Sequence, residues 1–458
     1  MTPKILSKTE SVCPECLVRI PAVRVQYGED VYLEKTCPEH GDFTTIIWRG
    51  QPSFTTWVRP KTPSYPQNPL TQVEHGCPFD CGLCPDHRQE SCCVLLEVTQ
   101  RCDLHCPVCF ADTDSHPAPD LTMAEIAGWY ERWLAVGGPF NVQLSGGEPC
   151  VRNDLPEIIR TGRSYGFSYF QLNTNGLRLA ADPAYLAELK TAGLSNVFLQ
   201  FDGTNDDIYK QLRGREILAQ KMAVIERCGE LGIGVVLVPT LLPGVNTDEI
   251  GKIIRLGLAH MPAVRGVHFQ PISYFGRYPR QPSDEARITI PEVIRAIEKQ
   301  TGGLISSASF CPPGGENAAC SFHGNFVLMP DGDLKALTRH KTECCCCQPV
   351  EAAQGSARSR EFVAEHWSSP APITDLPANS DLSLGEWDTF LERKRTHTFC
   401  ISGMAFQDAW TLDLERLRDC YIHTASPDGR LVPFCAYNLT DRQGRSLYRN
   451  KTRADHPA

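Results

Sequence analysis

Three cysteines, Cys102, Cys106 and Cys109, lie in the run EVTQRCDLHCPVCFAD, where the spacing Cx3Cx2C places three thiols in one short loop. Iron–sulfur clusters are held by cysteine thiolates and normally use four of them. A compact loop with only three therefore leaves one iron of a four-iron cluster open. The loop follows an apolar, strand-like run at 94–99. This arrangement predicts a cluster at which a small molecule completes the coordination.

A second motif, Ser145-Gly146-Gly147-Glu148-Pro149, follows the apolar stretch 140–144. Glycines allow close approach of the backbone, and a carboxylate can accept hydrogen bonds from an ammonium group. S-adenosylmethionine (SAM) carries such a group and is the candidate ligand for the open iron. The alternative for the three cysteines is a structural zinc site, but those sites usually pair cysteines as Cx2C or Cx4C with a fourth ligand nearby.

The two motifs together resemble the radical SAM superfamily. That resemblance implies that Cys102, Cys106 and Cys109 hold a catalytic 4Fe–4S cluster and that SAM chelates its fourth iron, with its amino group bound by Gly146, Gly147 and Glu148. An electron, supplied by a reductase such as flavodoxin or ferredoxin, then cleaves SAM to a 5′-deoxyadenosyl radical. This radical removes hydrogen from an unactivated carbon, and the protein positions and shields it.

Between residues 94 and 306 the sequence alternates apolar strands with amphipathic, helix-length segments, which predicts a parallel sheet in an α/β fold. Helices are expected at 123–136 and 155–165. The expected strands are 94–99, 140–147, 167–176, 196–203, 233–242 and 266–273. Six such units match the partial (β/α)6 barrel of the superfamily.

In parallel sheets ligands lie at the carboxyl ends of the strands. Asn173, Asn175, Asp202 and Gln270 all fall at those ends. Asn173 and Asn175 are candidates to contact the methionyl or ribose part of SAM, and Asp202 is a further polar candidate. Asn-Gly and Asp-Gly are also ordinary turn signals, which is the alternative interpretation of these residues.

Residues 1–60 contain Cys13, Cys16, Cys37 and His40 in the layout of a small mononuclear metal module. A tetrahedral Cys3His set suits zinc, and iron is less usual. Four protein ligands leave no open position, so a structural role is expected. The proline-rich stretch 60–69 then predicts a linker.

Segment 61–93 carries a second Cx3Cx2C loop, formed by Cys77, Cys81 and Cys84. We interpret it as an auxiliary 4Fe–4S site, which could relay electrons, bind substrate or support the fold. The alternative is one half of a zinc site. Cys92 and Cys93 are candidates for a fourth ligand, although neighbouring cysteines are as often ordinary buried residues.

The C-terminal region, 307–458, is rich in cysteine and predicts at least one further auxiliary cluster, with a set of buried thiols as the alternative. We assign no role to the run from Cys344 to Cys347, because adjacent residues cannot easily all bind one ion. The candidate ligands are Cys311, Cys320, Cys400, Cys420 and Cys435.

Composition limits the function classes. The 458 residues carry 45 Lys and Arg against 54 Asp and Glu, a net charge of −9 that argues against a nucleic-acid-binding surface. The 22 cysteines fall in metal-ligand spacings, which favours metal over disulfides. The chain has no apolar run of membrane-spanning length and no signal-peptide pattern, so a soluble, cytoplasmic protein is expected.

Five motifs, CPEC…CPEHG, HGCPFDCGLCPDH, EVTQRCDLHCPVCFAD, LSGGEP and PFCAYN, together resemble the tetraether lipid synthase group, formerly read as pterin methyltransferases. This resemblance spans nearly the whole chain. It implies carbon–carbon coupling on a lipid-like substrate, an auxiliary cluster that traps the first alkyl radical, and a peripheral position at the membrane. The cysteine run 344–347 has no counterpart in that group, which weakens transfer of the substrate.

Three other functions remain open at this point. The first is a radical SAM methyltransferase acting on a pterin or another heterocycle. The second is a maturation enzyme for a ribosomal peptide, in which auxiliary clusters help to bind the peptide. The third is a non-catalytic metal scaffold, against which the GGEP motif argues.

Overall fold

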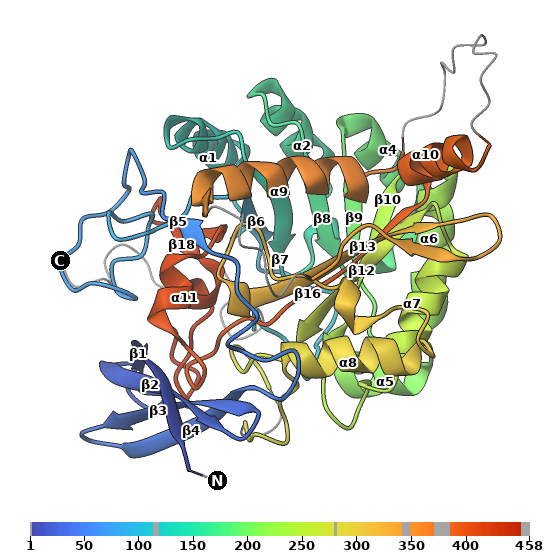
Figure 1. Cartoon of the computed structure of the whole chain (residues 1–458). Coiled ribbons are helices and arrows are strands. Elements are labelled where there is room, and N and C mark those ends of the chain that lie inside the picture. The colour runs from blue at the N-terminus through green and yellow to red at the C-terminus, as the bar shows by residue number, and fades with distance from the viewer. Residues whose placement is uncertain (1, 113–118, 279–281, 341–348, 371–384, 450–458) are drawn as a thin grey trace.

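The computed structural model describes residues 2–112, 119–278, 282–340, 349–370 and 385–449 (Figure 1). The run Cys344 to Cys347 lies outside these ranges. The N-terminal module is an antiparallel four-stranded meander, seen in dark blue in Figure 1. Its strands are β1 (Lys4–Val12), β2 (Arg19–Tyr27), β3 (Asp30–Cys37) and β4 (Gly41–Trp48).

The second and larger unit is built on a curved sheet whose central strands run parallel in chain order. These strands are β6 (Cys93–Thr99), β7 (Asn141–Gly146), β8 (Phe170–Thr174), β9 (Asn196–Gln200), β10 (Gly234–Val238) and β12 (Val264–Pro271), and β11 (Thr240–Leu241) pairs with β12. All six strands expected from the sequence are present. Strands buried on both faces are typical of parallel sheets, and β10 is buried along its whole length.

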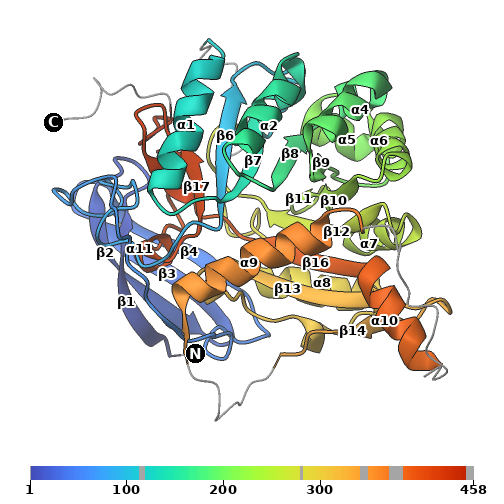
Figure 2. The same ribbon diagram turned by 90° about the horizontal axis from the view of Figure 1, so that it is seen from above.

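Helices cover the outer face of this sheet (Figure 2). They are α1 (Met123–Ala135), α2 (Leu155–Ser164), α3 (Leu177–Ala181), α4 (Pro183–Ala192), α5 (Asp206–Arg213), α6 (Leu218–Glu230), α7 (Ile250–Ala259) and α8 (Ile290–Gln300). The α1 helix begins with a capping box, in which Thr122 and Glu125 each accept a hydrogen bond from the other's backbone N–H. The α/β fold with a partial barrel and an N-terminal metal module is confirmed.

The C-terminal residues extend the sheet at both edges. At one edge β16 (Thr398–Met404) pairs parallel with β12 and antiparallel with β13 (Ser321–Leu328), which pairs with β14 (Leu334–Ala336). At the other edge β17 (Ile422–Ala425) pairs parallel with β6 and antiparallel with β18 (Leu431–Pro433). The region that the sequence analysis treated as a cysteine-rich addition therefore shares the barrel sheet.

Helix α9 (Ala352–Trp367) crosses the inner side of the curved sheet (Figure 2). Its backbone accepts hydrogen bonds from residues at the amino ends of two barrel strands. Asn141 Nδ2 donates to the Arg360 carbonyl at 3.1 Å, and Arg265 Nε donates to the His366 carbonyl at 3.0 Å. Because ligands enter parallel sheets at the carboxyl ends, α9 closes the opposite end of the barrel.

The remaining strands are β5 (Lys61–Thr62) and β15 (Val350–Glu351), which pair with each other, and the remaining α-helices are α10 (Glu386–Thr396), α11 (Leu414–Arg418) and α12 (Phe434–Tyr437). In the part of the chain that the structure describes, none of the helices combines the length and the apolar character needed to span a bilayer.

Candidate functional site

The three-cysteine loop lies directly after β6, at the carboxyl end of the barrel. Cys102, Cys106 and Cys109 are half-buried, and all three line one cavity of about 300 Å³ inside the barrel. Burial raises the pKa of Cys102 to about 12, so this thiol gives up its proton only when a cation takes its place. Three thiols facing a shared cavity fit a cluster whose remaining iron is open to a ligand.

The GGEP turn is fastened to the backbone that leads into this loop. The N–H of Gly147 donates to the Thr99 carbonyl at 2.9 Å, and the N–H of Glu148 donates to the Arg101 carbonyl at 2.9 Å. A Cβ atom at Gly147 would lie 2.3 Å from the Arg101 carbonyl oxygen. Glycine is therefore required here because the chain packs closely on itself.

The carboxylate of Glu148 lies 2% exposed between β7 and β8. It accepts hydrogen bonds from Thr174 Oγ1 at 2.7 Å, from the Cys150 N–H at 3.0 Å and from the Asn175 N–H at 2.7 Å. A carboxylate has about four acceptor positions, so one remains for an ammonium group. Burial raises the pKa of Glu148, and these three donors oppose that shift.

Asn173 and Asn175 line the same cavity as the three cysteines. Asn175 Nδ2 donates to Asp103 Oδ1 in the cysteine loop at 2.6 Å, and Lys221 Nζ donates to the Asn175 carbonyl. The structure thus brings the GGEP turn, the end of β8 and the cysteine loop together. Direct contact of Asn173 and Asn175 with SAM remains a prediction.

Asp202 is fully buried and is absent from the described residues that line the cavity. Arg213 donates to its two oxygens at 2.7 and 2.8 Å, and the Thr240 N–H adds a third bond at 3.1 Å. The same guanidinium donates to the Val108 carbonyl at 3.1 Å, between Cys106 and Cys109. Asp202 therefore holds Arg213, and through it the cysteine loop. The contact of Asp202 with SAM that the sequence suggested stays a prediction.

The deep part of the cavity has one polar and one aromatic side. The polar side carries the amides of Gln143, Gln171 and Asn173 from β7 and β8. On the aromatic side Trp367 of α9 stacks on Phe198, with ring centroids 5.5 Å apart and an interplanar angle of 22°. The alternating inward positions of β7 and β8 could have revealed the amides from sequence. No sequence pattern predicts that Trp367 lines the cavity, because α9 is far in sequence from the barrel strands.

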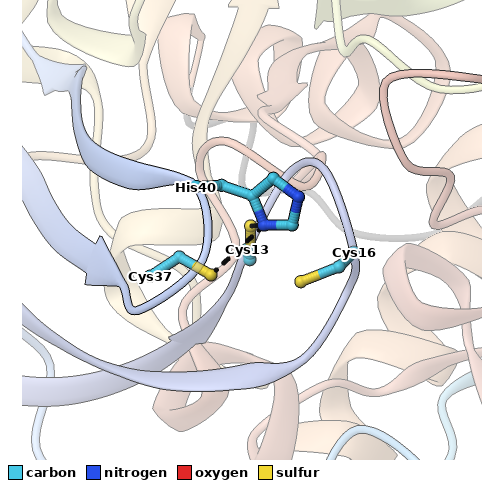
Figure 3. A group of neighbouring side chains, drawn as sticks. All are labelled: Cys13, Cys16, Cys37 and His40. Carbon is cyan, nitrogen blue, oxygen red and sulfur yellow. Dashed lines mark hydrogen bonds between the residues drawn. The ribbon is translucent and has the colours of Figure 1, made fainter.

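The N-terminal module brings Cys13, Cys16, Cys37 and His40 together, with all four ligand atoms within 4.8 Å of one another (Figure 3). Cys13 and Cys16 lie in the turn between β1 and β2, Cys37 ends β3, and His40 lies in the turn that leads to β4. His40 Nδ1 lies 3.4 Å from Cys37 Sγ, and this hydrogen bond lowers the pKa of Cys37 to about 6. A thiolate available near neutral pH beside three further donors suits a tetrahedral metal ion.

The second Cx3Cx2C loop packs against the C-terminal segment. Cys77 and Cys81 share an apolar cluster with Cys435 and Tyr448. The Tyr448 hydroxyl accepts from the Cys81 N–H at 3.0 Å and lies 2.6 Å from the Pro78 carbonyl. Cys84 is also buried. Cys92 and Cys93 line the barrel cavity.

The structure brings three of the five C-terminal cysteines together. Cys320, Cys420 and Cys435 line one small cavity, together with Arg416, whose Nε donates to Cys320 Sγ at 3.4 Å. The other two do not line it. Cys311 forms a backbone bridge with His323, and Cys400 lies in β16 opposite Gly266. Five residues line both this small cavity and the barrel cavity: Met404, Phe406, Tyr421, Ile422 and Phe434.

Two known sequence families match this chain. Residues 5–49 match the family described as HMPTM N-terminal zinc ribbon domain, which contains the four converging ligands. Residues 96–257 match the Radical SAM superfamily, a range that contains the end of β6, the three-cysteine loop, GGEP and the strands from β7 to β10. The 4Fe–4S cluster and SAM follow from the second match, and a zinc-type metal site follows from the first.

Individual relatives extend these matches. A 7,8-dihydro-6-hydroxymethylpterin dimethyltransferase of Methanocaldococcus jannaschii is 36% identical over 95% of this chain and 94% of its own length. A GTP 3′,8-cyclase of Marinobacter nauticus is 30% identical over 55% of this chain and 73% of its own. A methylornithine synthase with a known crystal structure matches this chain at 16% sequence identity and a TM-score of 0.37. The match covers 47% of this chain and 64% of the synthase chain. The similarity to the Methanocaldococcus jannaschii protein covers almost the full length of both proteins. This chain therefore belongs to the radical SAM superfamily and, within it, to the family of that protein.

Proposed function

We propose that this enzyme forms a carbon–carbon bond at an unactivated carbon, by methyl transfer to a pterin-like heterocycle held inside the barrel. The observation that supports this substrate most directly is the row of amide side chains from Gln143, Gln171 and Asn173 in the deep part of the cavity. Amides pair with the donors and acceptors at the edge of such a ring. The printed name of the Methanocaldococcus jannaschii relative, a dihydropterin dimethyltransferase, agrees with it.

Residues at the two ends of the cavity have different roles. When bound, the 4Fe–4S cluster and SAM supply the 5′-deoxyadenosyl radical. Cys102, Cys106 and Cys109 would hold the cluster, and Glu148 and Asn175 would orient SAM. Asn173, between Gln171 and Thr174 on β8, would lie where SAM and the heterocycle meet. Arg213 keeps the cysteine loop in place, and α9 closes the far end of the barrel, which keeps water away from the radical.

A second candidate is coupling at a lipid-like chain, as the tetraether lipid synthase resemblance implies. The observation that favours it is the apolar wall of Phe406, Ile422 and Phe434, which separates the barrel cavity from the three-cysteine cavity behind it. Under this candidate an auxiliary cluster at Cys320, Cys420 and Cys435 would trap an alkyl radical next to the substrate.

Product mass separates the two candidates. The anaerobically reconstituted, reduced enzyme would be incubated with SAM and either 7,8-dihydro-6-hydroxymethylpterin or a dispersed archaeal diether lipid. A pterin product heavier by one methylene unit supports methyl transfer. A lipid product lighter by two hydrogens and joined at a terminal carbon supports coupling and overturns the pterin proposal. The Cys102→Ala variant is the control for both reactions.

A further inference from the structure

Four cavity-lining residues form a directed row of hydrogen bonds along the inner face of the barrel. Gln171 Nε2 donates to Asn173 Oδ1 at 2.8 Å, and Asn173 Nδ2 donates to Gln143 Oε1 at 3.3 Å. Gln143 Nε2 in turn donates to Cys93 Sγ at 3.3 Å. Each amide therefore donates one of its two N–H groups to the next residue, and the row runs from Gln171 to Cys93.

Gln171, at the start of this row, donates through its nitrogen and accepts no hydrogen bond from the row. Gln171 Oε1 has no hydrogen-bond partner among the described residues, although Gln171 is 0% exposed. A buried acceptor without a donor is costly, and native proteins satisfy nearly all such groups. Asn196 Nδ2, opposite Gln171 in the β8–β9 register, is also unpaired but forms no hydrogen bond with this oxygen. Because Gln171 lines the cavity, a molecule bound there is a source of the missing donor.

We propose that Gln171 Oε1 accepts a hydrogen bond from an N–H group of the substrate and is a specificity-determining residue of this enzyme. The proposal rests on the heterocycle proposed above and names one of its contacts. A hydrocarbon chain has no donor for this oxygen, so Gln171 selects a ring that carries a lactam N–H or an amino group.

The place of Gln171 on β8 fits a substrate lying below SAM. Thr174, three residues further along the same strand, binds Glu148 at the end of the barrel that holds the cysteine loop. A strand rises about 3.3 Å per residue, so Gln171 lies roughly 10 Å deeper than that end. A bicyclic ring anchored at Gln171 therefore extends from the deep end of the cavity toward the radical.

The surroundings of Gln171 favour a flat and uncharged ring. Phe198, which stacks with Trp367, is paired with Asn173 in the β8–β9 register, one strand away from the amide row. Among the described residues that line the cavity, the carboxylate of Glu148 and the guanidinium of Arg213 are the charged groups, and both lie at the end with the cysteine loop. Burial lowers the pKa of His268 to about 4, so its imidazole is neutral as well.

The test measures binding of 7,8-dihydro-6-hydroxymethylpterin to the reconstituted full-length protein in the presence of SAM, by anaerobic calorimetry. Gln171→Met keeps the length of the side chain but removes the acceptor, and we expect affinity to fall roughly tenfold or more. Gln171→Glu, whose fully buried carboxyl group is protonated, keeps an acceptor oxygen and an O–H donor for Asn173 Oδ1, and should bind within roughly threefold of the wild type. Gln89→Met replaces a glutamine that is equally buried but outside the cavity, and should bind as the wild type does.

Each outcome decides the proposal. Unchanged affinity in Gln171→Met overturns it while leaving the pterin substrate in place. Equal losses in Gln171→Met and Gln171→Glu show that an acceptor oxygen at this position is not what the substrate requires, which also overturns it. Absence of binding by the wild type overturns both this contact and the heterocycle proposed above. SAM binding and iron content, measured on every variant, show whether its fold and cluster are intact.

Discussion

Arg213 and Asp202 form a buried, two-bonded ion pair directly behind the three-cysteine loop, with N–O distances of 2.7 and 2.8 Å. The arginine side chain is 9% exposed and the aspartate 0%. The third nitrogen of the guanidinium binds the Val108 carbonyl inside the loop. The loop that holds the cluster is thus fixed by a contact from outside the cysteine motif.

Replacing Arg213 by Met should therefore lower both stability and cluster retention. The change leaves the Asp202 carboxylate buried without its partner, which costs about 3–5 kcal/mol in comparable pairs. We expect a lower melting temperature and fewer irons per chain after anaerobic gel filtration. Arg160→Met is the matched control, because Arg160 forms ion pairs on the exposed surface and should change neither quantity appreciably. Full iron retention in Arg213→Met would contradict this role.

Glu148→Gln tests the carboxylate of the GGEP turn. In the wild type the Cys150 and Asn175 N–H groups donate to the two carboxylate oxygens, and the amide replaces one of these oxygens with an NH2 group that cannot accept. The change also removes the negative charge next to the expected ammonium group. SAM affinity should fall by roughly tenfold or more, since charged hydrogen bonds contribute about 1.5–3 kcal/mol. The cluster should remain, because the three cysteines are untouched. Wild-type affinity in this variant, with Glu157→Gln on the surface of α2 as control, would exclude the proposed contact.

The metal of the N-terminal module should stabilise the fold more than it supports turnover. Cys37→Ala removes one of four converging ligands, so the variant should lose one metal equivalent per chain, measured by elemental analysis. Its melting temperature should drop, while SAM cleavage per folded molecule stays near the wild-type value. Thr36→Ala, at the neighbouring position of β3, is the control. A Cys37→Ala protein that melts normally but no longer cleaves SAM would show that this metal takes part in the reaction.

Stability should fall in acid through the buried His87, whose pKa burial lowers from 6.5 to about 4. Below pH 6.5 the unfolded chain takes up a proton that the folded chain does not, so the free energy of unfolding decreases by about 1.4 kcal/mol per pH unit down to pH 4. His87→Gln removes this contribution. The difference in melting temperature between pH 7.5 and pH 5.5 should be smaller for the variant than for the wild type. An equal difference in both proteins would rule out His87 as a source of the acid sensitivity.

Much of the barrel could be predicted from sequence because its signals are local. The six strands alternate regularly with helices, and the ligands of the N-terminal module and the cysteine loop fall in short, fixed spacings. The pairing of Asp202 with Arg213 could not be predicted, because nothing in the local sequence distinguishes this contact from a solvated charge. The same holds for Gln171, whose open oxygen is apparent only once the hydrogen bonds of the row are known.

The C-terminal region was the hardest part to predict. Its strands β16 and β17 join opposite edges of the sheet, and both lie far in sequence from β12 and β6, the barrel strands with which they pair. The grouping of Cys320, Cys420 and Cys435, and the separate positions of Cys311 and Cys400, depend on this long-range pairing. Spacing in the sequence carries no information about such convergence.

The most direct test of the central claim is formation of 5′-deoxyadenosine by the anaerobically reconstituted, dithionite-reduced enzyme, measured beside a variant in which Cys102, Cys106 and Cys109 are all alanine. The wild type should cleave SAM, and the variant should lose about four irons and all cleavage while keeping its other metals. Equal 5′-deoxyadenosine formation by the two proteins would contradict the assignment of these cysteines to the radical-generating cluster.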